Sequence, residues 1–94
     1  MATMIVKHRV ASFESWKKVF DEMSPVRAKH GWTGHLVLQD ASDPNLVTIV
    51  NRMGTLAQAK AYGGSPELRA AMQRAGVQGP PEISFNEDAA EATY

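Results

Sequence analysis

Two side chains near the middle of the sequence are of the types that enzymes use for proton transfer and for anion binding. His35 is an imidazole with an ordinary pKa of about 6.5, so it can give or take a proton near neutral pH. Arg52 carries a guanidinium, which can hold a carboxylate, an enolate or a phenolate in a dry pocket. Both also have structural interpretations: a hydrogen-bonded histidine in a subunit interface, and an ion pair with Glu82 or with a partner chain. As a catalytic pair, His35 would act as the base and Arg52 would stabilise the negative charge that develops.

Several further residues are candidates for binding the same ligand: Arg9, Asn86, Thr48, His8 and Tyr62. The alternation of the first strand places His8 under the helices beside Trp16, where it would be structural. A slip of one residue in register would move it to the opposite face and into the site. Tyr62 is most simply a core residue, although a tyrosine at the rim of a pocket can donate a hydrogen bond to a substrate carbonyl.

Metal and cofactor chemistry is not expected from this sequence. The three histidines lie on separate elements without the spacing of metal ligands, so no metal site is predicted. The absence of cysteine excludes disulfides, thiolate metal sites and a cysteine nucleophile. Residues 56–75 contain no histidine to ligate haem, which leaves haem as a less favoured alternative to a site without a cofactor.

The elements that must position these residues alternate between strand-like and helix-like patterns. Residues 3–10 predict a strand and are followed by a helix from Ser12 that Pro25 kinks or restarts, with Ser24 as the second cap. The later elements are strands over 32–40 and 46–53, helices after Thr55 and Ser65, and a last strand, EISF, beyond the corner formed by Gly76, Gly79, Pro80 and Pro81. This order is that of the ferredoxin-like α+β fold, βαββαβ with a four-stranded antiparallel sheet. We expect one domain over residues 1–94, with a loose tail at 89–94.

In this fold all helices pack on one face of the sheet, and the other face, called the free face below, must be covered in another way. Pairing Leu38 with Val47 predicts that Leu36, Leu38, Val47 and Ile49 lie under the helices. The residues then predicted for the free face are His35, Val37, Thr48, Val50, Arg52, Ile5, Lys7, Arg9, Glu82, Ser84 and Asn86. This mixture is too apolar to be left in water, so we expect two copies to pair through their free faces and enclose a partly polar cavity.

Three segments resemble a known superfamily: VKHRVASFESWKKVFDE, DASDPNLVTIV and SPELRAAMQRAGVQGPPEISF. Together they are similar to the dimeric α/β-barrel superfamily, above all to its small bacterial members described as cyclase-like or antibiotic-biosynthesis-monooxygenase-like. The likeness covers residues 4–87. It implies a ferredoxin-like fold and a dimer, and it leaves open a cofactor-free oxygenase, a polyketide cyclase, a haem-degrading enzyme or no reaction. No motif transfers a catalytic residue, and IVNRM departs from the aromatic or acidic residue expected after the valine.

Composition narrows the classes of partner. The net charge is zero, with 44% hydrophobic and 21% charged residues, and the strand LVTIVNRM has no aromatic side chain on which a base could stack. Nucleic acid is therefore not expected. No apolar stretch approaches the roughly 20 residues that span a bilayer, and the start does not resemble a signal peptide, so we expect a cytoplasmic protein and no membrane partner.

These observations predict a small cytoplasmic homodimer with a cavity between its two sheets. The ligand expected there is a hydrophobic molecule that is enolisable or phenolic, handled by a cofactor-independent cyclase or monooxygenase. The alternative is a non-catalytic dimer that binds or senses a small ligand. Apolar walls with few polar groups fit both interpretations equally.

Overall fold

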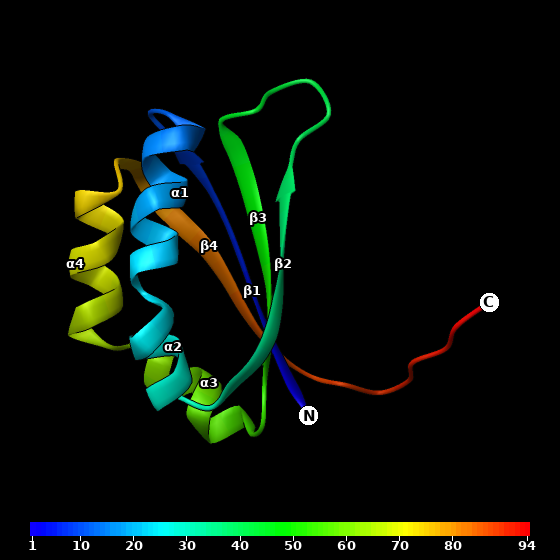
Figure 1. Ribbon diagram of the computed structural model, residues 1–94. Coiled ribbons are helices and arrows are strands. Elements are labelled where there is room, and N and C mark those ends of the chain that lie inside the picture. The colour runs from blue at the N-terminus through cyan, green and yellow to red at the C-terminus, as the bar shows by residue number, and fades with distance from the viewer.

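A four-stranded antiparallel sheet carries four helices on one of its faces in the computed structural model, which describes residues 1–94 (Figure 1). The elements are β1 (Ala2–Val10), α1 (Phe13–Glu22), α2 (Ser24–Lys29), β2 (Trp32–Gln39), β3 (Leu46–Met53), α3 (Leu56–Gly63), α4 (Pro66–Arg74) and β4 (Val77–Glu87). The strand order is β2-β3-β1-β4, which confirms the predicted ferredoxin-like arrangement. None of the four helices combines the length and the apolar character that crossing a membrane requires.

The helix boundaries follow local capping signals, with one exception. Ser12 and Ser65 each accept a hydrogen bond from a backbone N–H three residues on, and Thr55 forms a capping box with Gln58. Ser24 was predicted to cap α2, and this is wrong, because Ser24 is the first residue of that helix. The Met23 carbonyl accepts a hydrogen bond from Arg27 N at 3.0 Å, so the chain passes from α1 into α2 without the extended geometry that a serine cap needs.

The last strand is longer than expected. Gly76 ends α4 with a φ of 79°, a left-handed conformation that glycine adopts without a Cβ penalty, as predicted. Gly79, Pro80 and Pro81, expected to form the corner, instead belong to β4. Proline is tolerated there because β4 is an edge strand, and the pairing of β1 with β4 shifts register between Lys7 and Arg9.

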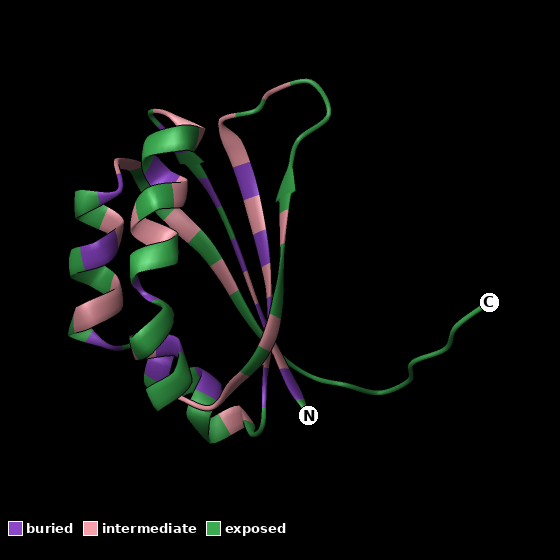
Figure 2. Cartoon of the chain, viewed as in Figure 1, coloured by how far each residue is buried: buried purple, intermediate pink, exposed green.

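The hydrophobic core lies between the sheet and the helices, where the buried segments of Figure 2 face one another. The buried core residues of the sheet are Ala2, Met4, Val6, Val10, Val47, Ile49 and Met53, and those of the helical layer are Trp16, Ala59, Tyr62 and Ala75. The alternation predicted for β1 and β3 is confirmed, since Val6, Val10, Val47 and Ile49 are all buried.

The alternation predicted for β2 is reversed. Leu36 lies opposite Val50 and Leu38 opposite Thr48, whereas Val37 lies opposite the buried Ile49. Leu36 and Leu38, expected under the helices, are on the free face and are 56% and 42% exposed. The cause is a register shift between Trp32 and Gly34, because one extra residue in a strand moves every later side chain to the other face.

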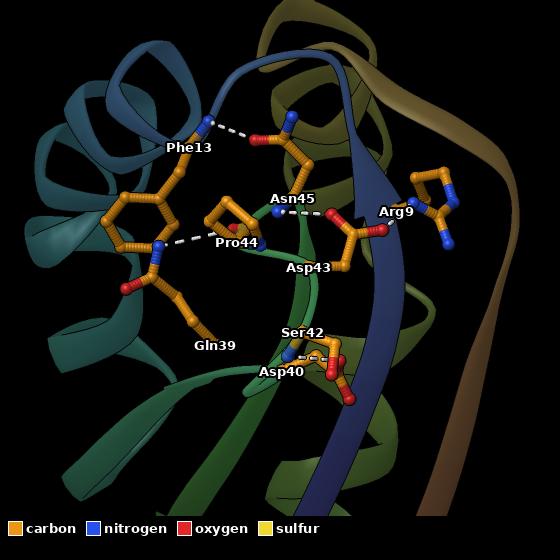
Figure 3. A network of polar contacts seen from close by, with 8 residues as sticks. All are labelled: Arg9, Phe13, Gln39, Asp40, Ser42, Asp43, Pro44 and Asn45. Atoms are coloured by element: carbon orange, nitrogen blue, oxygen red, sulfur yellow. Dashed lines mark hydrogen bonds and ion pairs between the residues drawn. The ribbon is translucent and has the colours of Figure 1, made fainter.

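The loop between β2 and β3 is held by a chain of polar contacts, called the hairpin network below and drawn in Figure 3. Its residues are Arg9, Phe13, Gln39, Asp40, Ser42, Asp43, Pro44 and Asn45. Arg9 pairs with Asp43, and its hydrogen bond lowers the pKa of the Asp43 carboxyl. Asp43 also accepts from Asn45 N at 3.0 Å, and the Asn45 amide oxygen accepts from Phe13 N at 3.1 Å. The network therefore ties the loop to the first turn of α1.

Candidate functional site

The residues predicted from the sequence to form one site lie on both faces of the sheet. His35 is opposite Asn51 on the helix side, and its ring meets Phe20 edge-on at 5.0 Å between centroids. Arg52 lies on the free face, since it alternates with the buried Asn51 and Met53. The predicted proximity of His35 and Arg52 is therefore wrong, and the register shift in β2 is the reason. Partial burial and the positive charge of Arg27 lower the pKa of His35.

Arg52 is already neutralised within its own chain. Its guanidinium is 2.6 Å from the Asp88 carboxylate and 3.7 Å from that of Glu91. Asp88 also accepts a hydrogen bond from the Thr3 hydroxyl at 2.6 Å. Arg52 therefore forms an ion pair, as one interpretation of the sequence predicted. Its partners are Asp88 and Glu91, which lie after β4, and not Glu82.

The other free-face candidates do not converge. Arg9 belongs to the hairpin network at one end of β1, while the Asn86 amide donates to the Thr3 carbonyl at 3.1 Å near the other end. Thr48 lines an open hollow of about 200 Å³ on this face. The remaining residues of the hollow are Ile5, Lys7, Glu82, Ile83 and Ser84.

A second space, the helix-side cavity, lies between the sheet and the helices and has a volume of about 50 Å³. Of its 16 lining residues 13 are hydrophobic, and the other three are His8, Asn51 and Arg27. By the same measure a single water molecule needs about 10–15 Å³, so the cavity holds several waters or a small organic group. The helix-side cavity is smaller than the free-face hollow. However, it is lined by buried polar atoms that lack hydrogen-bond partners, and the hollow is not, so the cavity is the better candidate site.

His8 is the titratable base of this cavity. It is 5% exposed, lies edge-on to Trp16 at 5.8 Å between ring centroids, and has no hydrogen-bond partner at either ring nitrogen. Its position under the helices beside Trp16 confirms the predicted alternation of β1. Burial lowers the pKa of His8 to about 4, so the ring is neutral at neutral pH and can accept a proton.

Asn51 was not among the residues predicted for the site. It is 1% exposed, and its amide donates to the Met4 carbonyl at 3.0 Å while its Oδ1 has no partner. A signal was present in the sequence, because Asn51 is the polar residue at a helix-side position between Ile49 and Met53. A lone polar residue at a buried position of a strand indicates either a structural hydrogen bond or a ligand contact, and Asn51 has one atom available for each.

Arg27 was also missed as a site residue, although it lies four residues after Met23 and so continues the helical spacing of Phe13, Trp16, Phe20 and Met23. Its side chain is buried and donates to the Phe20 carbonyl. The guanidinium carbon is 4.0 Å from the centroid of the Phe20 ring and 5.0 Å from that of Trp32. Burial lowers the pKa of this guanidinium, which nevertheless stays charged at neutral pH.

Tyr62 completes the aromatic wall of the cavity. Its ring is 5.1 Å from that of Trp32, and burial raises the pKa of its phenol to about 12. A neutral phenol can donate one hydrogen bond, so Tyr62 could donate to a ligand in the cavity. Of the residues predicted for ligand binding, His8 and Tyr62 therefore line the helix-side cavity, and Arg9, Thr48 and Asn86 do not.

Several solved structures of similar fold are described as antibiotic biosynthesis monooxygenases or as a cofactor-independent oxygenase. A proposed antibiotic biosynthesis monooxygenase of Nitrosomonas europaea is 17% identical, with a TM-score of 0.74 over 96% of this chain and 100% of its own. One of Bordetella bronchiseptica is 13% identical, with a TM-score of 0.78 over 95% and 97% of the two chains. SnoaB, a cofactor-independent oxygenase from Streptomyces nogalater, is 13% identical, with a TM-score of 0.77 over 96% and 94%.

The chain has the fold of the antibiotic biosynthesis monooxygenase-like proteins. This confirms, at the level of fold and over nearly the whole chain, the resemblance found in the three sequence segments. A scan against protein-family models and a search of curated protein sequences both find no match.

The chemical capacity of the helix-side cavity follows from its three polar residues. A neutral imidazole can take a proton, an amide oxygen can accept a hydrogen bond, and a guanidinium can hold an anion. No three histidine or acidic side chains lie close enough together to hold a metal ion. At about 50 Å³ the cavity is also far below the 300–1,000 Å³ of pockets that enclose large ligands, so a haem does not fit without rearrangement.

Proposed function

We propose that the protein binds a small, largely apolar molecule with an enolisable or phenolic group in the helix-side cavity, and that His8 takes a proton from it. The observation that carries this proposal is the buried His8 ring with both nitrogens unpartnered. A buried polar group that lacks a partner costs roughly 1–3 kcal/mol. Such a group is expected where a bound ligand or water supplies the missing hydrogen bond.

Burial lowers the pKa of His8 to about 4, so the ring is unprotonated at neutral pH and has a nitrogen free to accept a proton. The same burial makes it a weaker base than an ordinary histidine, so proton transfer depends on the anion that forms, whose negative charge raises the pKa of the imidazolium beside it. The proton comes from a C–H beside a carbonyl or from a phenol O–H, and leaves an enolate or a phenolate. An oxygenase without a cofactor must draw the electrons for dioxygen from its substrate, and such anions release electrons far more readily than the neutral molecules. SnoaB, which has the same fold at 13% identity, is a cofactor-independent oxygenase and so supports this reaction class over a cyclase.

The alternative is a protein that binds the same kind of molecule without turning it over. One observation favours it: no carboxylate or carbonyl bonds to either nitrogen of His8. Catalytic bases are usually oriented by a third group, and His8 lacks one. The two functions share the cavity and differ only in whether His8 moves a proton.

Ligand entry is tested with phenol as a probe and a cavity-filling pair of variants. Ala71 is buried and lines the cavity, whereas its neighbour Ala70 is exposed on the same helix. We expect phenol to change the fluorescence of Trp16 and Trp32, the Ala71→Leu variant to lose this response, and Ala70→Leu to keep it. An unchanged response in Ala71→Leu would place the phenol elsewhere and overturn the proposal.

Proton transfer is tested with phenylacetone, whose CH₂ hydrogens exchange in D₂O through an enolate. Wild-type protein is expected to accelerate this exchange, measured by NMR, and His8→Phe to lose about a hundredfold of the acceleration or more. The His35→Phe variant is the control, because His35 does not line the cavity. Phenol binding without accelerated exchange would favour the non-catalytic alternative.

We also propose that the protein is a homodimer joined through its free faces. Leu36 and Leu38 are exposed there next to the half-buried Ile5 and Val50, and the helices of the same chain all lie on the opposite face. The hollow beside Thr48 would then become the inter-sheet cavity expected from the sequence. Sedimentation should give a dimer at micromolar concentration, and Leu36→Glu with Leu38→Glu should give a monomer. A stable wild-type monomer would contradict the proposal.

The cytoplasmic location also stays a proposal, to be tested by cell fractionation.

A further inference from the structure

Arg27 differs from the other arginines in being buried without an acidic partner. Its residue is 6% exposed, whereas Arg9, Arg52 and Arg74 are more exposed and pair with Asp43, Asp88 and Glu22. The negative charge of Asp21 raises the pKa of Arg27, but Asp21 is paired with the Lys17 ammonium, which lies 2.6 Å from its carboxylate. No aspartate or glutamate lines the helix-side cavity.

The present contacts of Arg27 satisfy the guanidinium only in part. It donates to the Phe20 carbonyl and lies over the Phe20 and Trp32 rings, which attract a cation through their faces. A guanidinium has five N–H donors, and this carbonyl is the only hydrogen-bond acceptor it meets. An apolar side chain could pack against the same rings without removing a charge from water, so packing alone does not account for an arginine at this position.

The charges around the cavity leave Arg27 as the one group that can balance an anion. Of the lining side chains that titrate, His8 is neutral at neutral pH and Tyr62 keeps its proton. His35, which contacts Phe20 from the edge of this region, has a lowered pKa and is also neutral there. A ligand with a negative charge would therefore meet a single, pre-positioned countercharge in an otherwise apolar space.

We infer that the helix-side cavity takes its ligand as an oxyanion, a carboxylate, phenolate or enolate on an apolar body of about one ring, and that the Arg27 guanidinium holds the charged oxygen. The inference rests on the proposed function, because it concerns the same cavity and adds the charge of the bound molecule. At about 50 Å³ the cavity is smaller than the roughly 150 Å³ that encloses a benzene ring, so a ring enters only when side chains of the wall move. Met23 and Met72 belong to the wall, and their side chains are flexible enough to make this space. The fork of the guanidinium suits two oxygens of a carboxylate, or one phenolate or enolate oxygen.

The test compares benzoate with benzamide, which have nearly the same shape and differ in charge, by calorimetry on the full chain. Wild type should bind benzoate at least about tenfold more tightly than benzamide, and Arg27→Met should lose this preference through weaker benzoate binding. Arg27→Lys, which keeps the charge but not the fork, should retain part of the preference. The Arg69→Met variant is the control, because Arg69 is exposed and outside the cavity, and it should bind both probes as wild type does.

The outcomes separate this inference from the proposed function. Equal binding of benzoate and benzamide by wild type, or a preference that survives in Arg27→Met, would overturn the role of Arg27 and leave the cavity as a ligand site. If the protein binds neither probe and does not bind phenol, both the role of Arg27 and the proposed function are overturned.

Binding of a phenolate, as opposed to a carboxylate, is tested with para-nitrophenol, which absorbs visible light only when ionised. Wild type should lower its apparent pKa on binding, Arg27→Met should not, and an unchanged apparent pKa in wild type would restrict the oxyanion to carboxylates.

Discussion

The hairpin network and the helix-side cavity treat polar side chains in opposite ways. In the network, Arg9 pairs with Asp43, Asp43 accepts from Asn45 N at 3.0 Å, and Asn45 accepts from Phe13 N at 3.1 Å, all near the surface. In the cavity, both nitrogens of His8 and the Oδ1 of Asn51 are buried without a partner. The first region uses its polar groups to hold the chain, whereas in the second these three atoms make no hydrogen bond within the protein, although the Asn51 amide nitrogen does. Such groups are expected at a binding site, because a ligand can complete them.

This difference can be measured, because it predicts opposite signs for substitutions in the two regions. Removing a partnered group should destabilise the protein, since the other partner loses its hydrogen bond. Replacing an unpartnered buried group by an apolar one of similar shape should leave the stability unchanged or raise it. The following predictions begin with the aromatic wall, go on to His8 and end at the hairpin network.

The largest effect is expected at the wall of the cavity. Trp16 is buried and stacks on Phe20 at 5.0 Å between ring centroids. The Trp16→Ala variant should lose about 3–5 kcal/mol of free energy of unfolding, because the enlarged cavity cannot close completely. Urea denaturation measures this, with Trp16→Phe as the milder control. A loss below about 1 kcal/mol would show that the cavity wall collapses without cost.

The pH dependence of stability should report the neutral state of His8. Its pKa is about 4 in the folded protein, against an ordinary value of 6.5, so the unfolded chain binds a proton first as the pH falls. The contribution of His8 to stability is therefore complete well above pH 6.5, falls by about 3 kcal/mol as the pH drops to about 4, and levels off below that. Denaturation at a series of pH values measures the slope, and His8→Phe should reduce it. An equal slope in that variant would assign the effect to other groups.

At neutral pH the His8→Phe substitution itself should raise the free energy of unfolding by about 1 kcal/mol. Phenylalanine keeps an aromatic ring against Trp16 and removes two buried nitrogens that have no partners. The His35→Phe control should change stability little, because that ring is largely exposed. A clear destabilisation by His8→Phe would mean that water or another group bonds to the imidazole in the free protein.

An effect of similar size to that of His8→Phe, but of opposite sign, is expected in the hairpin network. The Asn45→Ala variant removes the acceptor for Phe13 N, the first residue of α1, and should cost about 1 kcal/mol. Ser42→Ala is the matched control in the same loop, because the contact of Ser42 is made by its backbone N–H. Thermal melting distinguishes the two, and equal melting temperatures would show that the loop does not support α1.

Much of the fold could be predicted because it depends on signals that are local in the chain. The caps at Ser12, Thr55 and Ser65 and the positive φ of 79° at Gly76 follow from side chains within a few residues. The alternation of β1 placed His8 under the helices beside Trp16, as the structure shows. The candidate site was predicted less well, since it depends on which faces of different strands meet.

The sequence by itself determined the order of elements, the helix ends other than the start of α2, and the apolar character of one face of β1 and β3, because these follow from local propensity and from period-two alternation. Only the tertiary structure decided which side chains share a site. The register shift between Trp32 and Gly34 moved His35 to the helix side of the sheet, away from the face of Arg52. Gly34 marks the place, since a glycine inside a strand often accompanies a bulge, but a glycine alone does not specify the register on either side of it. The packing of α1 and α2 on the sheet then brought His8, Asn51 and Arg27, from three separate elements, to the lining of one cavity. The position of a bulge depends on how well the sheet and the helical layer pack together. Packing across the entire domain is therefore the reason why the site could not be predicted from the sequence.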